Sequence, residues 1–346
     1  HTGLPPAARR LSPGPGSPAS TPRPNTRPRA GAVPAASAAP GRVGEDTGMR
    51  ILVAGASGFL GTRLTGRLRA EGHEIVRLVR RPARGPDEVR WDPPAGQLDP
   101  AALSGVDAVV NLAGANISDR RWNRDFKEVL RTSRVDTTAT LARAIAARPA
   151  GARPAVFLNG SAIGWYGDTG DRPVEEDAPA GDGFMADICR VWEAATAPAE
   201  QAGVRVVRLR TGLPLDRSGG FLKPQLLPYR LGIAGKFGNG RQWIPWISMA
   251  DWLSAVGFLL ARDDIAGPVN VVGPAPVTNA EFTRVLGRHL RRPTVMPVPG
   301  FALRILLGEM SIEVLHSARV LPGVLRNAGF RYEHPDLASA IRAALV

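Results

Sequence analysis

Apolar runs of strand length alternate with helical repeats along the chain from residue 50 onwards. Leu60, Leu64 and Leu68 recur every four residues, so they share one face of a helix expected over 58–71. A longer helix is expected over 123–147. Buried strands are expected at 50–54, 74–79, 107–112, 155–159 and 204–209. This alternation predicts an α/β fold with a parallel sheet that helices cover on both faces.

Glycine and proline become frequent after Thr211, and the expected elements become shorter. We expect a smaller mixed region with helices at 221–231, 250–261 and 280–290 and strands at 243–247 and 268–272. The sheet and this mixed region together predict one domain over 49–296. The pattern from 297 to 346 is helical and apolar, and predicts a C-terminal domain.

Residues 1–48 are rich in Pro, Ala, Arg, Ser and Gly and have almost no large apolar side chain. Such a segment cannot bury enough apolar surface to offset its ordering entropy, so we predict a disordered extension. It also lacks the apolar core of a signal peptide. Because the first strand follows Met49 directly, we expect the folded protein to begin there.

The formal net charge of +13 raises the question of a polyanion partner. Residues 1–48 hold six arginines and two acids and so carry +4 of this charge. No basic run is interleaved with aromatic residues, so we expect no specific nucleic-acid partner. No apolar run approaches the roughly 18 residues of a membrane span, so no membrane partner is expected. The single cysteine, Cys189, excludes an internal disulfide, and we expect no metal site and a cytoplasmic location.

Three glycines, Gly55, Gly58 and Gly61, lie between the first strand and the first helix. In a dinucleotide-binding loop they allow a tight turn, a close approach of the pyrophosphate and close packing of the helix. The helix N-terminus then favours the negative charge of the pyrophosphate. The alternative is a glycine-rich turn without a ligand. We therefore predict a doubly wound Rossmann sheet whose cofactor contacts are Gly55, Ser57, Gly58, Phe59, Leu60, Gly61, Leu112, Ala113 and Gly114.

The residues after the second strand indicate which cofactor binds. An NAD enzyme usually has an acid here to hold the ribose 2′-hydroxyl, whereas this chain has Arg80 and Arg81. Two guanidinium groups suit a 2′-phosphate. We therefore predict NADP(H) rather than NAD(H). The alternative is that both arginines are solvated loop residues.

The segment from Asn159 to Asp168 ends a strand with Ser161 and continues to Tyr166-Gly167. It resembles the segment of extended short-chain dehydrogenases in which a serine hydrogen-bonds the substrate oxygen. The Tyr-x-x-x-Lys pair that usually follows is replaced by Met185 and Cys189 when Glu193 is aligned with the acid after the motif. Methionine carries no proton, and we expect Cys189 to be a buried structural residue. Ser161 and Tyr166 remain as catalytic candidates, although Tyr166 would need a nearby cation to lower its pKa. The alternative for Tyr166 is a packed ring with its hydroxyl bonded to the backbone.

These stretches together resemble the YfcH-type epimerase family, an atypical branch of the extended short-chain dehydrogenases. Further matching segments are Arg121-Trp122, Trp192-Glu193, Leu209-Arg210-Thr211-Gly212, Gly240-Arg241-Gln242-Trp243, Asp251, Leu321-Pro322 and Ala328-Gly329-Phe330. The resemblance extends from Met49 to Val346 and implies a Rossmann fold that binds NADP(H). The missing Tyr/Lys pair is typical of this branch.

The same resemblance implies that Arg121, Trp122, Arg241 and Trp243 line a substrate cleft. Arg241 would hold a phosphate or carboxylate, and Trp243 would cover a sugar or ring. The alternative is a surface turn with a buried tryptophan. On the helix over 123–147, Lys127 and Arg134 are expected on a solvated face.

Two functions remain open for the chain. The first is an NADP(H)-dependent oxidoreductase or epimerase that acts on a small molecule. The oligomeric state is left open, and a homodimer is one of the states considered. The second is a non-catalytic NADP(H)-binding sensor, which the missing Tyr/Lys pair would explain. A third, polyanion binding, rests on net charge alone.

Overall fold

The computed structural model describes residue 3 and residues 48–346, so the predicted extension lies almost entirely outside the described residues. Its centre is an eight-stranded sheet with the order β13-β8-β6-β5-β1-β2-β3-β4. All neighbouring strands are parallel except β3 and β4. The strands are β1 (Arg50–Ala54), β2 (Glu74–Val79), β3 (Glu88–Asp92), β4 (Gln97–Leu98), β5 (Ala108–Asn111), β6 (Val156–Ala162), β8 (Arg205–Thr211) and β13 (Gly267–Val271).

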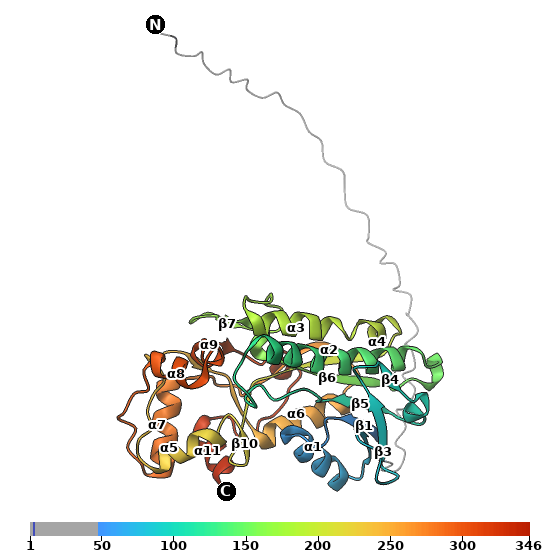
Figure 1. The fold of residues 1–346 in the computed structure, drawn as a ribbon, viewed down its shortest axis with the longest axis horizontal. Coiled ribbons are helices and arrows are strands. Elements are labelled where there is room, and N and C mark those ends of the chain that lie inside the picture. The colour runs from blue at the N-terminus through green and yellow to red at the C-terminus, as the bar shows by residue number, and fades with distance from the viewer. Residues whose placement is uncertain (1–2, 4–47) are drawn as a thin grey trace, which may run out of the picture. The chain divides into compact units, whose positions relative to one another are not determined.

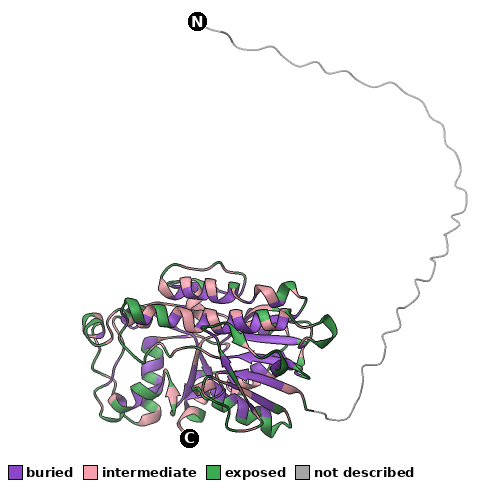
Figure 2. Ribbon diagram, turned by 45° about the vertical axis from the view of Figure 1, so that its right-hand side comes forward, coloured by how far each residue is buried: buried purple, intermediate pink, exposed green. Residues whose placement is uncertain are grey.

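Helices cover both faces of this sheet, as the sequence predicts (Figure 1). On one face lie α1 (Phe59–Ala70) and α6 (Met249–Ala261), whose apolar side chains join Val53 and Val110 of the sheet in one core cluster. On the other face lie α2 (Arg124–Ala146), α3 (Phe184–Ala194) and α4 (Ala197–Gln201). The strands between these layers are almost wholly buried (Figure 2). The strand order reverses between β5 and β1, and ligands bind at such a point in doubly wound folds.

The mixed region packs around a third core cluster that contains Trp246, Phe282 and Leu286. Its helices are α5 (Lys223–Arg230), α7 (Asn279–Leu290) and α11 (Leu337–Leu345). Its strands are β9 (Leu213–Asp216), β10 (Gly219–Gly220), β11 (Trp243–Ile244), β12 (Trp246–Ser248) and β14 (Val277–Thr278). The single strand expected over 243–247 is divided, since β11 pairs with β14 and β12 pairs with β9. Pro245 lies at the division, and proline has no N–H to donate to a sheet.

The last fifty residues contain α8 (Gly300–Leu307), α9 (Met310–Leu315), β15 (Arg319–Val320), α10 (Gly323–Asn327) and α11. They belong to the same compact unit as the sheet, which extends over Asp46–Val346. β15 pairs with β7 (Pro173–Val174), and α11 packs against α7 and β12. The remaining elements are the short 3-10 helices η1 (Pro100–Leu103), η2 (Ala150–Ala152) and η3 (Ile163–Tyr166). Among the described residues no helix is both long and apolar enough to cross a membrane.

Candidate functional site

The glycine loop joins β1 to α1 in a turn that only small residues can form. Gly55 has a φ of +79°, and a Cβ there would lie 2.6 Å from the carbonyl carbon of Leu112. A Cβ on Gly61 would lie 2.0 Å from the carbonyl oxygen of Gly55. The tight turn at Gly55 and the close helix packing at Gly61 are therefore confirmed. Leu112 donates its backbone N–H to Ala54, which holds the Leu112–Gly114 segment beside the loop.

The N-terminus of α1 is open to an anion. Within the described residues no side chain caps α1, and its first turn contains no acid. Gly58 is the N-cap, and both Ser57 and Gly58 are exposed. The free N–H groups and the helix dipole therefore face open space, which suits a pyrophosphate.

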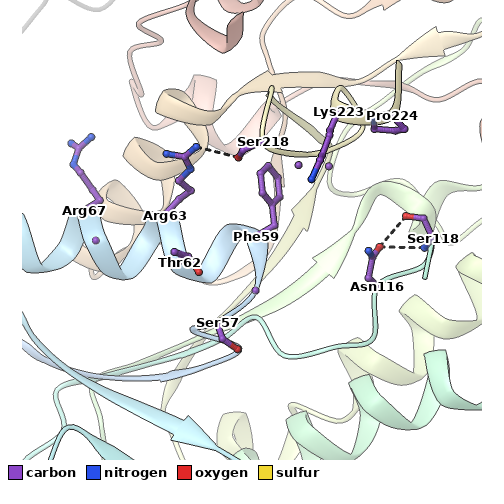
Figure 3. A pocket seen from close by; sticks show the side chains of 14 residues that line it. Ser57, Phe59, Thr62, Arg63, Arg67, Asn116, Ser118, Ser218, Lys223 and Pro224 are labelled. Carbon is purple, nitrogen blue, oxygen red and sulfur yellow. Dashed lines mark hydrogen bonds between the residues drawn. The ribbon is translucent and has the colours of Figure 1, made fainter. Parts of the chain in front are cut away.

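A cavity of about 900 Å³ opens at this helix end (Figure 3). The ring of Phe59 packs on the hairpin of β9 and β10. The contact is so close that a Cβ on Gly219 would lie 2.4 Å from the ring. Lys223 of α5 points into the cavity toward Phe59. Four polar residues that line the cavity from outside the glycine loop and α1 were not predicted from the sequence, although Lys223 is one of only three lysines in the chain. They are Asn116, Ser118, Ser218 and Lys223.

The two arginines predicted for the 2′-phosphate differ in their surroundings. Arg81 donates from both terminal nitrogens to the carboxylate of Glu88, each at 2.7 Å. These hydrogen bonds lower the pKa of Glu88 to about 2. Arg80 is exposed and forms no ion pair with any residue that the structure describes. Arg80 is therefore free to meet a ligand, whereas Arg81 is already held by a buried carboxylate.

Both catalytic candidates lie in one buried cluster, the Glu193 cluster, which consists of Ser161, Tyr166, Glu193, Arg210 and Asn270. Ser161 of β6 donates its hydroxyl to Glu193 Oε1 at 2.6 Å. Arg210 of β8 is the register partner of Ser161 and binds both oxygens of Glu193, at 2.8 and 2.9 Å. The hydroxyl proton of Ser161 is therefore directed to Glu193 in this arrangement, and not toward a ligand.

Tyr166 is unsuited to proton exchange, which corrects its assignment as a catalytic residue. It is 3% exposed, and its hydroxyl donates to Asn270 Oδ1 at 2.7 Å. Arg210 does contact the hydroxyl at 3.0 Å, as the sequence analysis required of a pKa-lowering cation. Burial nevertheless raises the pKa of Tyr166 to about 12. The alternative of a packed ring is confirmed, but its hydroxyl is bonded to the side chains of Asn270 and Arg210 and not to the backbone.

Met185 and Cys189 of α3 lie against the turn after β6. A Cβ on Gly164 would lie 3.0 Å from Met185 Cβ, and the Cys189 thiol points at the carbonyl of Ala162 at 3.6 Å. Burial raises the pKa of Cys189 to about 12, so the thiol stays protonated near neutral pH. The expectation that Cys189 is a buried structural residue is confirmed.

The profile of the NAD dependent epimerase/dehydratase family matches residues 51–273, more than half of the chain. The chain belongs to this family. A second profile, a domain of unknown function named DUF1731, matches residues 298–344.

Relatives match almost the whole of the folded part of this epimerase-family chain. An epimerase family protein of Mycobacterium bovis is 44% identical over 292 residues, covering 84% of this chain and 96% of its own length. The crystal structure of the human epimerase family protein SDR39U1 with NADPH has 35% identity and a TM-score of 0.78, covering 86% of this chain and 99% of that one. A nucleoside-diphosphate sugar epimerase from Corynebacterium glutamicum has 34% identity and a TM-score of 0.72; the match covers 87% of this chain and 59% of that one.

The four residues predicted to line the substrate cleft of this epimerase-family chain form two pairs with different contacts, since Arg241 and Trp243 share Asp171 while Arg121 and Trp122 do not contact it. Arg121 binds the carbonyls of Ile305 and Leu306 at the end of α8. Trp122 is buried, and its ring nitrogen donates to Ile117 at 2.8 Å. Trp243 donates to Asp171 at 3.0 Å.

Arg241 stays exposed, with only a 3.9 Å ion pair to Asp171. None of the four lines the cavity beside α1 in the part of the chain that the structure describes. Their assignment to one substrate cleft is therefore not supported by their positions.

Proposed function

We propose that the chain is an NADP(H)-dependent oxidoreductase or epimerase of the extended short-chain dehydrogenase type, in the YfcH-type branch. The observation that carries this proposal is the glycine loop. Gly55 packs against Leu112, and the uncapped N-terminus of α1 opens on a cavity of about 900 Å³. The human relative whose structure contains NADPH supports the same cofactor.

Different parts of the chain bind the pyrophosphate and the 2′-phosphate of the cofactor. The N–H groups at the start of α1 hold the pyrophosphate, and Arg80 holds the 2′-phosphate. The bound nicotinamide supplies a hydride to the substrate or accepts one from it. Arg81 supports this site indirectly, because its pairing with Glu88 anchors the loop in which Arg80 lies.

The substrate is a small molecule that carries a phosphate or a sugar. Lys223 has no ion-pair partner among residues 48–346, so its charge is available to an anionic group in the cavity. The Corynebacterium relative is a nucleoside-diphosphate sugar epimerase, which supports a ligand of this kind.

A non-catalytic NADP(H) sensor is the second candidate, and the Glu193 cluster favours it. The hydroxyls of Ser161 and Tyr166 are both engaged inside the protein, and the Tyr/Lys pair is replaced by Met185 and Cys189. A sensor needs only to bind the cofactor, whereas an enzyme must oxidise or reduce it. Incubation with NADP⁺ or NADPH and a panel of nucleotide sugars separates the two when the sugar products are analysed together with the cofactor absorbance, because an epimerase regenerates its cofactor and shows no net turnover of it.

Calorimetry on the full chain with NADPH and NADH tests the cofactor site. We expect wild type to bind NADPH more tightly than NADH. Arg80→Ala removes a charged hydrogen-bond donor and should weaken NADPH binding about tenfold to a hundredfold while NADH binding stays unchanged. Arg90→Ala, at an exposed arginine of β3, is the matched control. If neither nucleotide binds, the glycine loop is only scaffold and the proposal fails.

A further inference from the structure

Arg134 of α2 is a buried cation without a carboxylate partner. It is 8% exposed and forms no ion pair with any described residue. Its Nη1 donates to the carbonyl of Leu130 at 2.9 Å, and its Nε is enclosed without a hydrogen-bond partner. Nη2 also has no hydrogen bond to the described residues. Unlike Nε, it is not fully buried and therefore reaches the molecular surface. The prediction that Arg134 lies on a solvated face is therefore wrong.

Arg210 shows how the same chain treats a buried arginine that serves the fold. Its guanidinium meets both oxygens of Glu193, the hydroxyl of Tyr166 and the carbonyl of Glu176. A buried charge that lacks such partners destabilises the folded state. Burial accordingly lowers the pKa of Arg134. A bound anion would offset the unfavourable free energy of this buried charge, so the site favours an anionic ligand.

The surroundings of Arg134 place it beside the cofactor loop. Its guanidinium carbon lies 5.2 Å from the ring centroid of Trp192 on α3. On another side lies Gly114 of the Leu112–Gly114 segment, where a Cβ would be 3.5 Å from that carbon and 3.7 Å from Nη1. Gly114 is exposed and has no side chain that could cover the guanidinium from this side. Cys189, which aligns with the position of the missing lysine, lies on α3, the helix that also carries Trp192.

We propose that Arg134 binds an anionic oxygen of the substrate, a carboxylate or phosphate group, at the inner end of the cofactor site. The proposal rests on the proposed function, because it places the substrate next to the cofactor loop. Arg134 then supplies the cation that Cys189 cannot supply, and the anion compensates its buried charge. The open side at Gly114 is the route by which the anion reaches Nη2.

Calorimetric titration of sodium oxalate and of inorganic phosphate into the full chain saturated with NADPH tests the proposal. We expect wild type to bind at least one of these anions and Arg134→Met to bind it at least about tenfold more weakly. Arg134→Lys should keep part of the affinity. Arg143→Met, at an exposed arginine of the same helix, is the matched control and should bind as wild type does.

A second measurement separates a binding role from a structural one. Without anion, the melting temperature of Arg134→Met should not fall, because the variant removes an uncompensated buried charge. A lower melting temperature together with unchanged anion affinity overturns the proposal, and so does a wild type that binds neither anion. If Arg134→Met does not fold, Gly114→Ala places a methyl group near the guanidinium and should weaken anion binding; unchanged binding then overturns the proposal.

The NADPH titration distinguishes this proposal from the proposed function. Affinity for NADPH should stay within about threefold of wild type in Arg134→Met, because the anion comes from the substrate. A larger loss shows that Arg134 holds a cofactor phosphate, which overturns the assignment to the substrate. If the wild type binds oxalate or phosphate at Arg134 but binds no nucleotide, the anion site is supported and the proposed oxidoreductase function fails.

Discussion

Glu88 and Glu193 each hold an arginine side chain in a two-point ion pair. Glu88 binds Arg81 at the end of β2, and Glu193 binds Arg210 on β8. Both carboxylates are almost completely buried, so each needs its arginine. In consequence both arginines direct their terminal nitrogens to a carboxylate, whereas no carboxylate among the described residues holds Arg80 or Arg134.

The pair between Arg81 and Glu88 predicts a pH-dependent contribution to stability. The folded state lowers the pKa of Glu88 from about 4.5 to about 2, so the pair stabilises the fold fully above pH 4.5 and loses this effect as the pH falls toward 2. Glu88→Gln should therefore be less stable than wild type at pH 7, and the difference should shrink between pH 4.5 and 2.5. Urea unfolding across this range measures it, with Glu128→Gln, at an exposed acid of α2, as control. A difference that is constant with pH contradicts the prediction.

The β1-α1-β2 unit is the element that sequence patterns predict best. Its strands, helix and glycine spacing are all local signals, and the structure has them within one or two residues. The Glu193 cluster could not be predicted in this way. Ser161, Glu193 and Arg210 are far apart in sequence and meet only because β6 and β8 pair in one particular register. The strand β3 was missed as well, because its sequence EVRWD is short and holds only two apolar residues, with no apolar run.

Arg134 was missed for a related reason. It lies on α2, where arginine is usually solvated, and its burial depends on α3 and the Leu112–Gly114 segment. Periodicity along one helix does not show which neighbours cover it. A signal was available in the sequence, because Leu130, Thr137 and Leu141 place position 134 near the apolar face of α2.

Two glycines of α1 predict opposite effects of the same substitution. Gly61→Ala places a methyl group 2.0 Å from the backbone of Gly55, so α1 must move away from the cofactor loop. We expect a loss of about 1–3 kcal/mol in the free energy of unfolding and a weaker binding of NADPH. Gly66→Ala faces open space and should stabilise the fold by about 0.5–1 kcal/mol through helix propensity. Urea unfolding and NADPH titration of both variants test this, and equal effects at the two positions would falsify the assigned packing role of Gly61.

At the scale of the whole molecule, the C-terminal residues complete the core of the mixed region. Leu337, Ala340 and Ile341 of α11 join the cluster that contains Trp246 and Phe282. Asp251, buried at the start of α6, accepts hydrogen bonds from the backbone N–H groups of Glu333 and His334. The segment predicted as a domain over 297–346 therefore shares its core with the residues before it.

A chain that ends at residue 296 should consequently fail to form a rigid fold. Without α11 the third core cluster is exposed to water, and Asp251 loses both of its backbone donors. We expect the truncated chain to lose its near-ultraviolet circular dichroism and to bind no NADPH. Asp251→Asn in the full chain isolates one part of this effect and should cost about 1–3 kcal/mol, because one carboxylate oxygen becomes an amide that cannot accept. Cooperative unfolding of the truncated chain would show instead that residues 49–296 fold alone, and that the contacts of Asp251 and α11 only add to a core that is already sufficient.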